Sequence, residues 1–217
     1  QKMDGYASPE DFKNKFNMYC RNLTELNQAS LTSYVLHRKV ILDFFERALE
    51  INDSGKFSKE SIIHSIICPM QTTSDQIPFD NMNLWIIDDR LAYHHFLSSD
   101  QAMNKVSTLQ NGSSDRMDLA IFNTPFSYAE DINNINSITI IELKRPMRDD
   151  LHDEESPIAQ VLRYVKDIRS GKIKKKNGRS FGPVDNVAFY CYIIADLTDT
   201  LKESATLSNL SPTPDGK

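Results

Sequence analysis

Three side chains in this sequence have types and spacing suited to work on a phosphate ester: Asp118, Glu142 and Lys144. Glu142 and Lys144 lie two residues apart in an apolar run, and the two-residue period of a strand puts both on one face. Ile141 and Leu143 then enter the apolar layer behind. Asp118 opens an earlier apolar run. If the two runs are neighbouring strands, the carboxylates of Asp118 and Glu142 can share one divalent cation.

The cation expected at such a site is Mg²⁺ or Mn²⁺. It prefers hard oxygen ligands and usually keeps waters, one of which can become the nucleophile that attacks phosphorus. Lys144 would position or help to deprotonate that water and offset the charge that grows on the phosphate. The structural alternative is an exposed ion pair between Glu142 and Lys144, which is the commoner role of such a pair. The surrounding elements favour the catalytic interpretation.

Helices are predicted before the site. Apolar residues recur at helical spacing from Ser30 to Glu50, with Ser30 available as an N-cap, and a weaker helical pattern covers residues 9–26. Ser58 can cap a further helix that carries Glu60 and stops before Pro69. Residues 1–55 are therefore predicted to be a helical lead-in, or a linker to an absent upstream domain.

Short β-rich runs dominate the rest of the chain. Four strands are predicted, at residues 84–87, 118–122, 138–144 and 188–195. A helix over residues 157–170, closed by Gly171, lies between the last two strands. The intervening polar stretches, 71–83, 98–114 and 123–137, are predicted loops. The sequence thus predicts an α/β domain over residues 56–217, with a central mixed four-stranded sheet flanked by helices.

The order of these elements carries a family resemblance. Asp118, followed well downstream by Glu142-Leu143-Lys144, resembles the PD-(D/E)xK or restriction-endonuclease-like nucleases, although Met117 stands where the family motif has proline. Gln160 and Tyr164 resemble the Q-x-x-x-Y element of RecB-like members, and their four-residue spacing puts them on one helical face. The resemblance implies that both border the active site.

Glu60 resembles the extra acidic residue that many of these nucleases contribute from the first core helix, which would make it a third metal ligand beside Asp118 and Glu142. The alternatives stay open. Glu60 could be an exposed residue favoured by the helix dipole, and Gln160 and Tyr164 could simply cap and pack their helix. A basic run could supply phosphate contacts or be a solvated loop; it consists of Lys172, Lys174, Lys175, Lys176 and Arg179.

A wider resemblance, from about Tyr34 to the end, is to C-terminal nuclease-like modules of bacterial GHKL-type ATPases associated with defence against foreign DNA. It is carried by residues 83–93, 140–149 and 190–197. No ATP-binding motif is visible, so we expect an excised module whose ATPase partner domain is absent. The function implied is metal-dependent endonuclease hydrolysis of DNA. Rival interpretations are a catalytically silent fold that binds nucleic acid or protein inside a larger ATPase, and a structural docking module.

Net charge, cysteine content and the length of apolar runs limit the classes of protein to which this chain can belong. The net charge of −5 argues against coating nucleic acid by global attraction but permits a local basic groove. Three dispersed cysteines support neither a disulfide framework nor a zinc site. No apolar run approaches a membrane span, so a cytoplasmic protein is expected. His64 is interpreted as a packed side chain, and the pair His94 and His95 as unrelated to a histidine-metal site. A homo-oligomer is compatible with the sequence.

Overall fold

The computed structural model describes residues 9–102, 109–110, 116–123, 135–149, 155–170, 172, 174–175 and 187–214. The chain divides into two compact units, Gln1–Phe44 and Phe45–Lys217, whereas the sequence placed the boundary after residue 55. No helix in the described residues is long and apolar enough to cross a membrane.

The first unit consists of most of helix α1, Pro9–Leu49, which is a single continuous helix. The predicted N-cap at Ser30 is wrong, because Ser30 lies in the middle of this helix. Pro9 suits the first helical position, and no glycine or further proline interrupts the run that follows. The helix ends before a turn in which Asn52 Oδ1 accepts hydrogen bonds from Ser54 N and Lys56 N.

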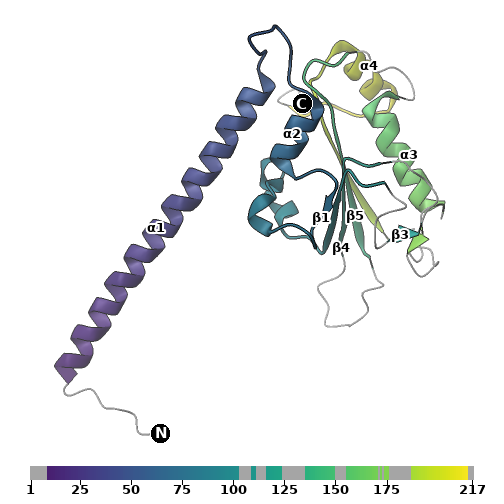
Figure 1. Ribbon diagram of the computed structural model, residues 1–217. Helices are drawn as coiled ribbons and strands as arrows, with labels where there is room; N and C mark the ends of the chain where they lie inside the picture. The colour runs from purple at the N-terminus through teal and green to yellow at the C-terminus, as the bar shows by residue number, and fades with distance from the viewer. Residues whose placement is uncertain are drawn as a thin grey trace. The chain divides into compact units, whose positions relative to one another are not determined.

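The second unit is an α/β domain with a mixed five-stranded sheet (Figure 1). The strand order is β1-β2-β4-β5-β7, and every pair is antiparallel except β5 and β7, which are parallel. The strands are β1 Thr72–Thr73, β2 Phe96–Ser99, β4 Leu119–Asn123, β5 Ser137–Leu143 and β7 Ala188–Ile194. A separate two-stranded ladder joins β3 Leu109–Gln110 to β6 Lys174–Lys175.

Two predictions for the region before β4 are wrong. The apolar run at 84–87 is a 3-10 helix, η2 Leu84–Ile86, between η1 Phe79–Asn81 and η3 Asp89–Ala92. Asn83 anchors it, because its backbone N donates to Ile67 O and its Nδ2 donates to Ile66 O. The missing strand of the sheet is β2, half of which falls in the stretch predicted as a loop. Similarly, β1 and η1 fall within the predicted loop 71–83.

Helices cover both faces of the sheet. Helix α3, Pro157–Arg169, packs Val161, Tyr164 and Ile168 on a face formed by residues such as Ala120 and Ile140. Helix α2, Glu60–Ile67, packs on the opposite face. Burial on both faces explains why β5 is an almost continuous apolar run rather than an alternating one.

The ends of these helices differ in part from the predictions. The N-cap of α2 is Lys59 rather than Ser58, and its side chain makes no capping hydrogen bond. Gly171, predicted to close α3, lies outside the described residues. After β7, Thr198 caps helix α4, Asp199–Leu207, with its side chain accepting from Leu201 N.

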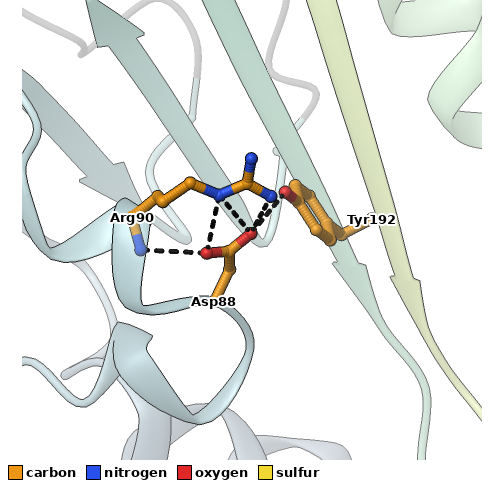
Figure 2. A network of polar contacts seen from close by, with 3 residues as sticks. All are labelled: Asp88, Arg90 and Tyr192. Carbon is orange, nitrogen blue, oxygen red and sulfur yellow. Dashed lines mark hydrogen bonds and ion pairs between the residues drawn. The ribbon is translucent and has the colours of Figure 1, made fainter.

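A polar network ties the η3 segment to β7 (Figure 2). Asp88 accepts hydrogen bonds from the backbone N and the guanidinium of Arg90, and Tyr192 Oη donates to Asp88 Oδ2 at 3.2 Å. The Arg90 guanidinium holds the pKa of Asp88 well below its usual range. The segment is therefore fixed to the sheet edge by a side-chain network rather than by strand pairing.

Candidate active site

The ends of β4 and β5 place Asp118 and Glu142 side by side. The antiparallel register pairs Leu119 with Ile141, so one further step along the same ladder sets Asp118 opposite Glu142. Both residues then project from the face covered by α3. Asp118 Oδ2 accepts a hydrogen bond from Leu143 N at 2.7 Å, which fixes the carboxylate across the strand pair.

Lys144 is buried beside Glu142. Its Nζ lies 2.5 Å from Glu142 Oε1 and 3.2 Å from Gln160 Oε1, and the residue is 8% exposed. Its backbone N donates to Ile194 O, which continues the parallel pairing of β5 with β7. A solvated surface pair is therefore excluded. Removing two opposite charges from water is costly, so a buried ion pair of this kind need not stabilise the fold. Stabilisation alone is therefore a weak explanation for the Glu142–Lys144 pair.

The carboxylates of Asp118 and Glu142 lie close together and interact electrostatically. Burial, followed by the neighbouring Asp118 carboxylate, raises the pKa of Glu142 to about 7, although the Lys144 ammonium opposes the shift. Burial also raises the pKa of Asp118, while the hydrogen bond from Leu143 N acts against this change. Glu142 Oε2 is buried and has no hydrogen-bond partner within the described part of the chain. Such an orphaned oxygen is unusual in a folded protein and needs an explanation.

Glu60 approaches the same site from the first turn of α2. Burial raises the pKa of Glu60, whereas the Lys144 ammonium lowers it and the Asp118 carboxylate raises it. The backbone N–H of Arg145 donates to the Glu60 carboxylate, and this hydrogen bond also lowers the pKa. Glu60 therefore lies within electrostatic range of Asp118, Lys144 and Glu142 rather than facing distant solvent.

Helix α3 contributes Gln160 and Tyr164. Gln160 contacts Lys144 through Oε1 and donates from Nε2 to Glu155 O at 3.1 Å. Tyr164 is 5% exposed, and its Oη donates to Arg116 O at 2.7 Å. Burial, followed by the Glu142 carboxylate, raises the pKa of Tyr164 to about 12. The two residues thus border the carboxylates, but Tyr164 is also a core residue that braces the start of the segment leading into β4.

The basic run is only partly described. Lys172 Nζ pairs with Asp167 Oδ1 at 2.7 Å on the surface of α3. Lys174 and Lys175 form β6, which pairs with β3. Lys176 and Arg179 lie outside the described residues.

Asp100 is a site neighbour that the sequence analysis missed. It directly follows β2 in a left-handed conformation, with φ of 44°, and its backbone N donates to Asp118 O at 2.8 Å. Its carboxylate pairs with Arg116 at 3.5 Å and contributes to the raised pKa of Asp118. The sequence could not identify Asp100 as a site residue, because strand β2 was not predicted and only its register with β4 brings Asp100 next to Asp118.

His64 and His94 each contact a residue outside the site. His64 is buried, and its Nε2 lies 2.9 Å from Ser99 Oγ; burial lowers its pKa. His94 Nδ1 contacts Leu91 O at 2.9 Å, and His95 is exposed.

The donor set fits one kind of cation. Among the residues that the structure describes, no group of three or more His, Cys, Asp or Glu side chains is arranged to hold a metal ion. The site instead offers the adjacent carboxylates of Asp118 and Glu142, and Glu142 Oε2 has no hydrogen-bond partner among the described residues. This composition suits Mg²⁺ or Mn²⁺, which bind few carboxylates and keep waters. It does not suit structural zinc, which takes four protein ligands.

Comparisons with protein-family models, curated proteins and solved structures gave no match to this chain.

Proposed function

We propose that this protein hydrolyses phosphodiester bonds of DNA in a divalent-metal-dependent reaction, as a nuclease of the PD-(D/E)xK type. The observation that carries the proposal is that the half-buried Asp118 lies opposite the buried Glu142 and Lys144 at the adjoining ends of two central strands. The mixed arrangement of the four longer strands, β2, β4, β5 and β7, supports the restriction-endonuclease-like assignment. A role as the effector of an antiviral defence protein, beside an ATPase partner domain, rests on the sequence resemblance.

In this proposal Asp118 and Glu142 hold Mg²⁺ or Mn²⁺, and Glu60 assists from α2. When bound, the metal supplies Lewis-acid stabilisation of a phosphate and lowers the pKa of water. The ammonium of Lys144 orients the attacking water and offsets negative charge that develops on the phosphate. Gln160 holds Lys144 in place through its Oε1, so it is a positioning residue. Tyr164 fixes the strand entry that carries Asp118.

The alternative is a catalytically silent module that binds nucleic acid or protein. One observation favours it: the described residues do not assemble three metal-ligating side chains. The nuclease and the silent module differ in whether the protein cuts DNA.

The test is incubation of the protein with single-stranded DNA and with supercoiled plasmid, with Mg²⁺ or Mn²⁺ and with EDTA. Cleavage is expected with either metal, and it should disappear with EDTA and in Asp118→Asn. Asp199→Asn is the matched control, because Asp199 is an exposed carboxylate on α4. DNA binding without cleavage by the wild-type protein would support the silent alternative and overturn the nuclease proposal.

The basic run yields a separate prediction about affinity. Replacing Lys172, Lys174, Lys175, Lys176 and Arg179 by Ala is expected to weaken DNA binding and to flatten its dependence on salt. Each lost phosphate contact should reduce the slope of log affinity against log salt by about 0.7–0.9, because fewer counterions are released on binding. Binding titrations over a range of salt concentrations measure this slope. An unchanged slope would mean that the run is a solvated surface; the ion pair of Lys172 with Asp167 predicts that Lys172 contributes least.

A further inference from the structure

A polar cavity of about 420 Å³ opens beside the candidate active site. Its volume lies in the usual range for a small-ligand pocket, but its lining is unlike the apolar lining that such pockets commonly have. Among the residues that the structure describes, seven of the eight that line it are polar or charged; they are Gln71, Thr73, Asp75, Gln76, Asp100, Gln101, Ala102 and Arg116.

Two hydrogen bonds join this cavity to the catalytic residues. Asp100, in its wall, donates from its backbone N to Asp118 O at 2.8 Å. Arg116, also in its wall, accepts at its carbonyl oxygen from Tyr164 Oη at 2.7 Å. A polymer whose phosphate lies at Asp118 and Glu142 would therefore pass directly beside the cavity, and a neighbouring nucleotide unit can reach it.

The charges of the cavity disfavour a phosphate. Asp75 and Asp100 both line it, and Arg116, the cation among the described lining residues, is already paired with Asp100 at 3.5 Å. A phosphate there would meet the Asp75 carboxylate. A bound metal ion is also disfavoured, because the pairing of Asp100 with Arg116 leaves Asp75 alone among the described lining carboxylates to bind it. A neutral molecule that donates and accepts hydrogen bonds fits the lining better than either ion.

Hydrogen bonds to the backbone determine which atoms of the Gln76 and Gln101 side-chain amides remain available to a ligand. Gln76 Oε1 accepts from Thr73 N at 2.9 Å, so its Nε2 is the atom left to donate. Gln101 Nε2 donates to Gln71 O at 3.2 Å, so its Oε1 is the atom left to accept. On the wall formed by Asp75, Gln76 and Gln101, the cavity thus offers one amide donor beside the acceptor oxygens of Gln101 and the Asp75 carboxylate, which matches a ligand edge that carries N–H groups next to an acceptor.

We propose that this cavity is a subsite for an unpaired nucleobase next to the scissile phosphate, and that it favours bases with an exocyclic amino group. Cytosine presents an N4 amino donor, to which aspartate oxygens bind well, whereas thymine presents the O4 acceptor and a methyl group at the same edge. The inference rests on the proposed function, because a nucleic-acid substrate is what brings a base to this wall. It adds that the substrate strand is single at this position and is read by Asp75, Gln76 and Gln101.

The experiment compares binding of oligo(dC) and oligo(dT) strands of about 12 nucleotides, a typical length for single-strand sites, to the whole chain in EDTA, measured by fluorescence anisotropy. The two strands carry equal charge and both contain pyrimidines. We expect oligo(dC) to bind about 10-fold more tightly, equivalent to about 1.4 kcal/mol. The double variant Asp75→Asn, Gln76→Ala should reduce this ratio to about 2-fold or less. Gln28→Ala, which removes an exposed amide that does not line the cavity, should leave the ratio unchanged.

The outcomes separate this proposal from the proposed function. Equal affinity for both strands, or a ratio that the cavity variants do not change, overturns the base-binding proposal even if the protein cuts DNA. A cavity-dependent preference for oligo(dC), together with no cleavage in the separate assay with Mg²⁺ or Mn²⁺, supports the subsite and contradicts the nuclease assignment. No binding to either strand overturns the base-binding proposal, and the cleavage assay with Mg²⁺ or Mn²⁺ still decides the nuclease proposal.

Discussion

Replacing Lys144 by Ala is expected to slow DNA cleavage by about 10²–10³-fold while DNA binding largely persists, because the loss of one preorganised electrostatic group commonly costs this much in rate. The Lys144 ammonium is buried next to Glu142 and Gln160, where its charge is poorly screened and its position is fixed. A merely structural buried ion pair would contribute to stability, commonly about 3–5 kcal/mol on removal of one partner, but not to the cleavage rate of the folded protein. A catalytic and a merely structural role therefore differ by the size of the effect on rate.

Lys202→Ala is the matched control for this experiment. Lys202 also pairs with an acidic residue, Asp199 at 3.4 Å, but both side chains are largely exposed. Its variant should cut DNA at the wild-type rate. Because Lys144→Ala also opens a cavity at a buried position, Lys144→Met, which keeps most of the side-chain volume, should be measured as well. Thermal melting should show that each variant is folded. A folded Lys144 variant that cuts as fast as the wild type would refute the catalytic assignment.

The elements that the sequence predicted well are those buried on both faces or strongly amphipathic. The run 138–144 is observed as β5 Ser137–Leu143, and the pattern at 157–170 as α3 Pro157–Arg169. In each case the hydrophobic pattern and the burial agree. Four apolar residues at 84–87, by contrast, are too few to separate a strand from a helical turn. Their conformation is decided by the hydrogen bonds of Asn83 to α2.

Strand β2 was missed because half of it is polar. Ser98 and Ser99 are buried, which a pattern of hydrophobicity cannot predict. Their burial is tolerated because the strand ladder satisfies their backbone groups and Ser99 Oγ contacts His64 Nε2 at 2.9 Å. That contact is tertiary, so it leaves no local trace in the sequence. With β2 unrecognised, the cavity beside Asp100 could not be predicted either.

The candidate site, too, could be predicted from the sequence only in part. The spacing of Glu142 and Lys144 within one strand was sufficient to put them on one face. Their position next to Asp118 depends on the pairing and register of β4 and β5. The sequence prediction therefore held only if these two strands were neighbours. The approach of Glu60 required the packing of α2 against the other face of the sheet. Neither the register nor the packing follows from the periodicity of a single segment.

A second large effect is expected in the pH dependence of stability, and it arises from Glu142. Its pKa rises from 4.5 in the unfolded chain to about 7 in the folded protein, mainly because of burial and then because of Asp118. The folded state therefore binds this proton more tightly. The stability that results is fully present below pH 4.5 and is lost as the pH rises to 7. A shift of this size corresponds to about 3 kcal/mol.

The measurement is the free energy of unfolding in urea, without divalent cations, for the wild type and for Glu142→Gln between about pH 4.5 and pH 7.5. The difference between the two proteins reports Glu142 together with its interaction with Asp118 and Glu60, while His64 and His94, whose pKa values are lowered, titrate in both. On going from pH 7.5 to pH 4.5, the wild type should gain about 3 kcal/mol relative to the variant. Parallel profiles would mean that Glu142 is already ionised throughout this range.

Adding Mg²⁺ extends this test to the proposed metal site. A cation that binds Glu142 and Asp118 takes the place of the proton, so it should stabilise the folded wild type most at pH 7.5, where both carboxylates are ionised. Binding to the folded state alone raises the free energy of unfolding by RT ln(1 + [Mg²⁺]/Kd). Glu142→Gln should lose most of this gain, because it removes one of the two adjacent carboxylates and leaves Asp118 alone. If Mg²⁺ stabilises the wild type and Glu142→Gln equally, the ion binds elsewhere, and the buried Glu142 Oε2 is not a metal ligand.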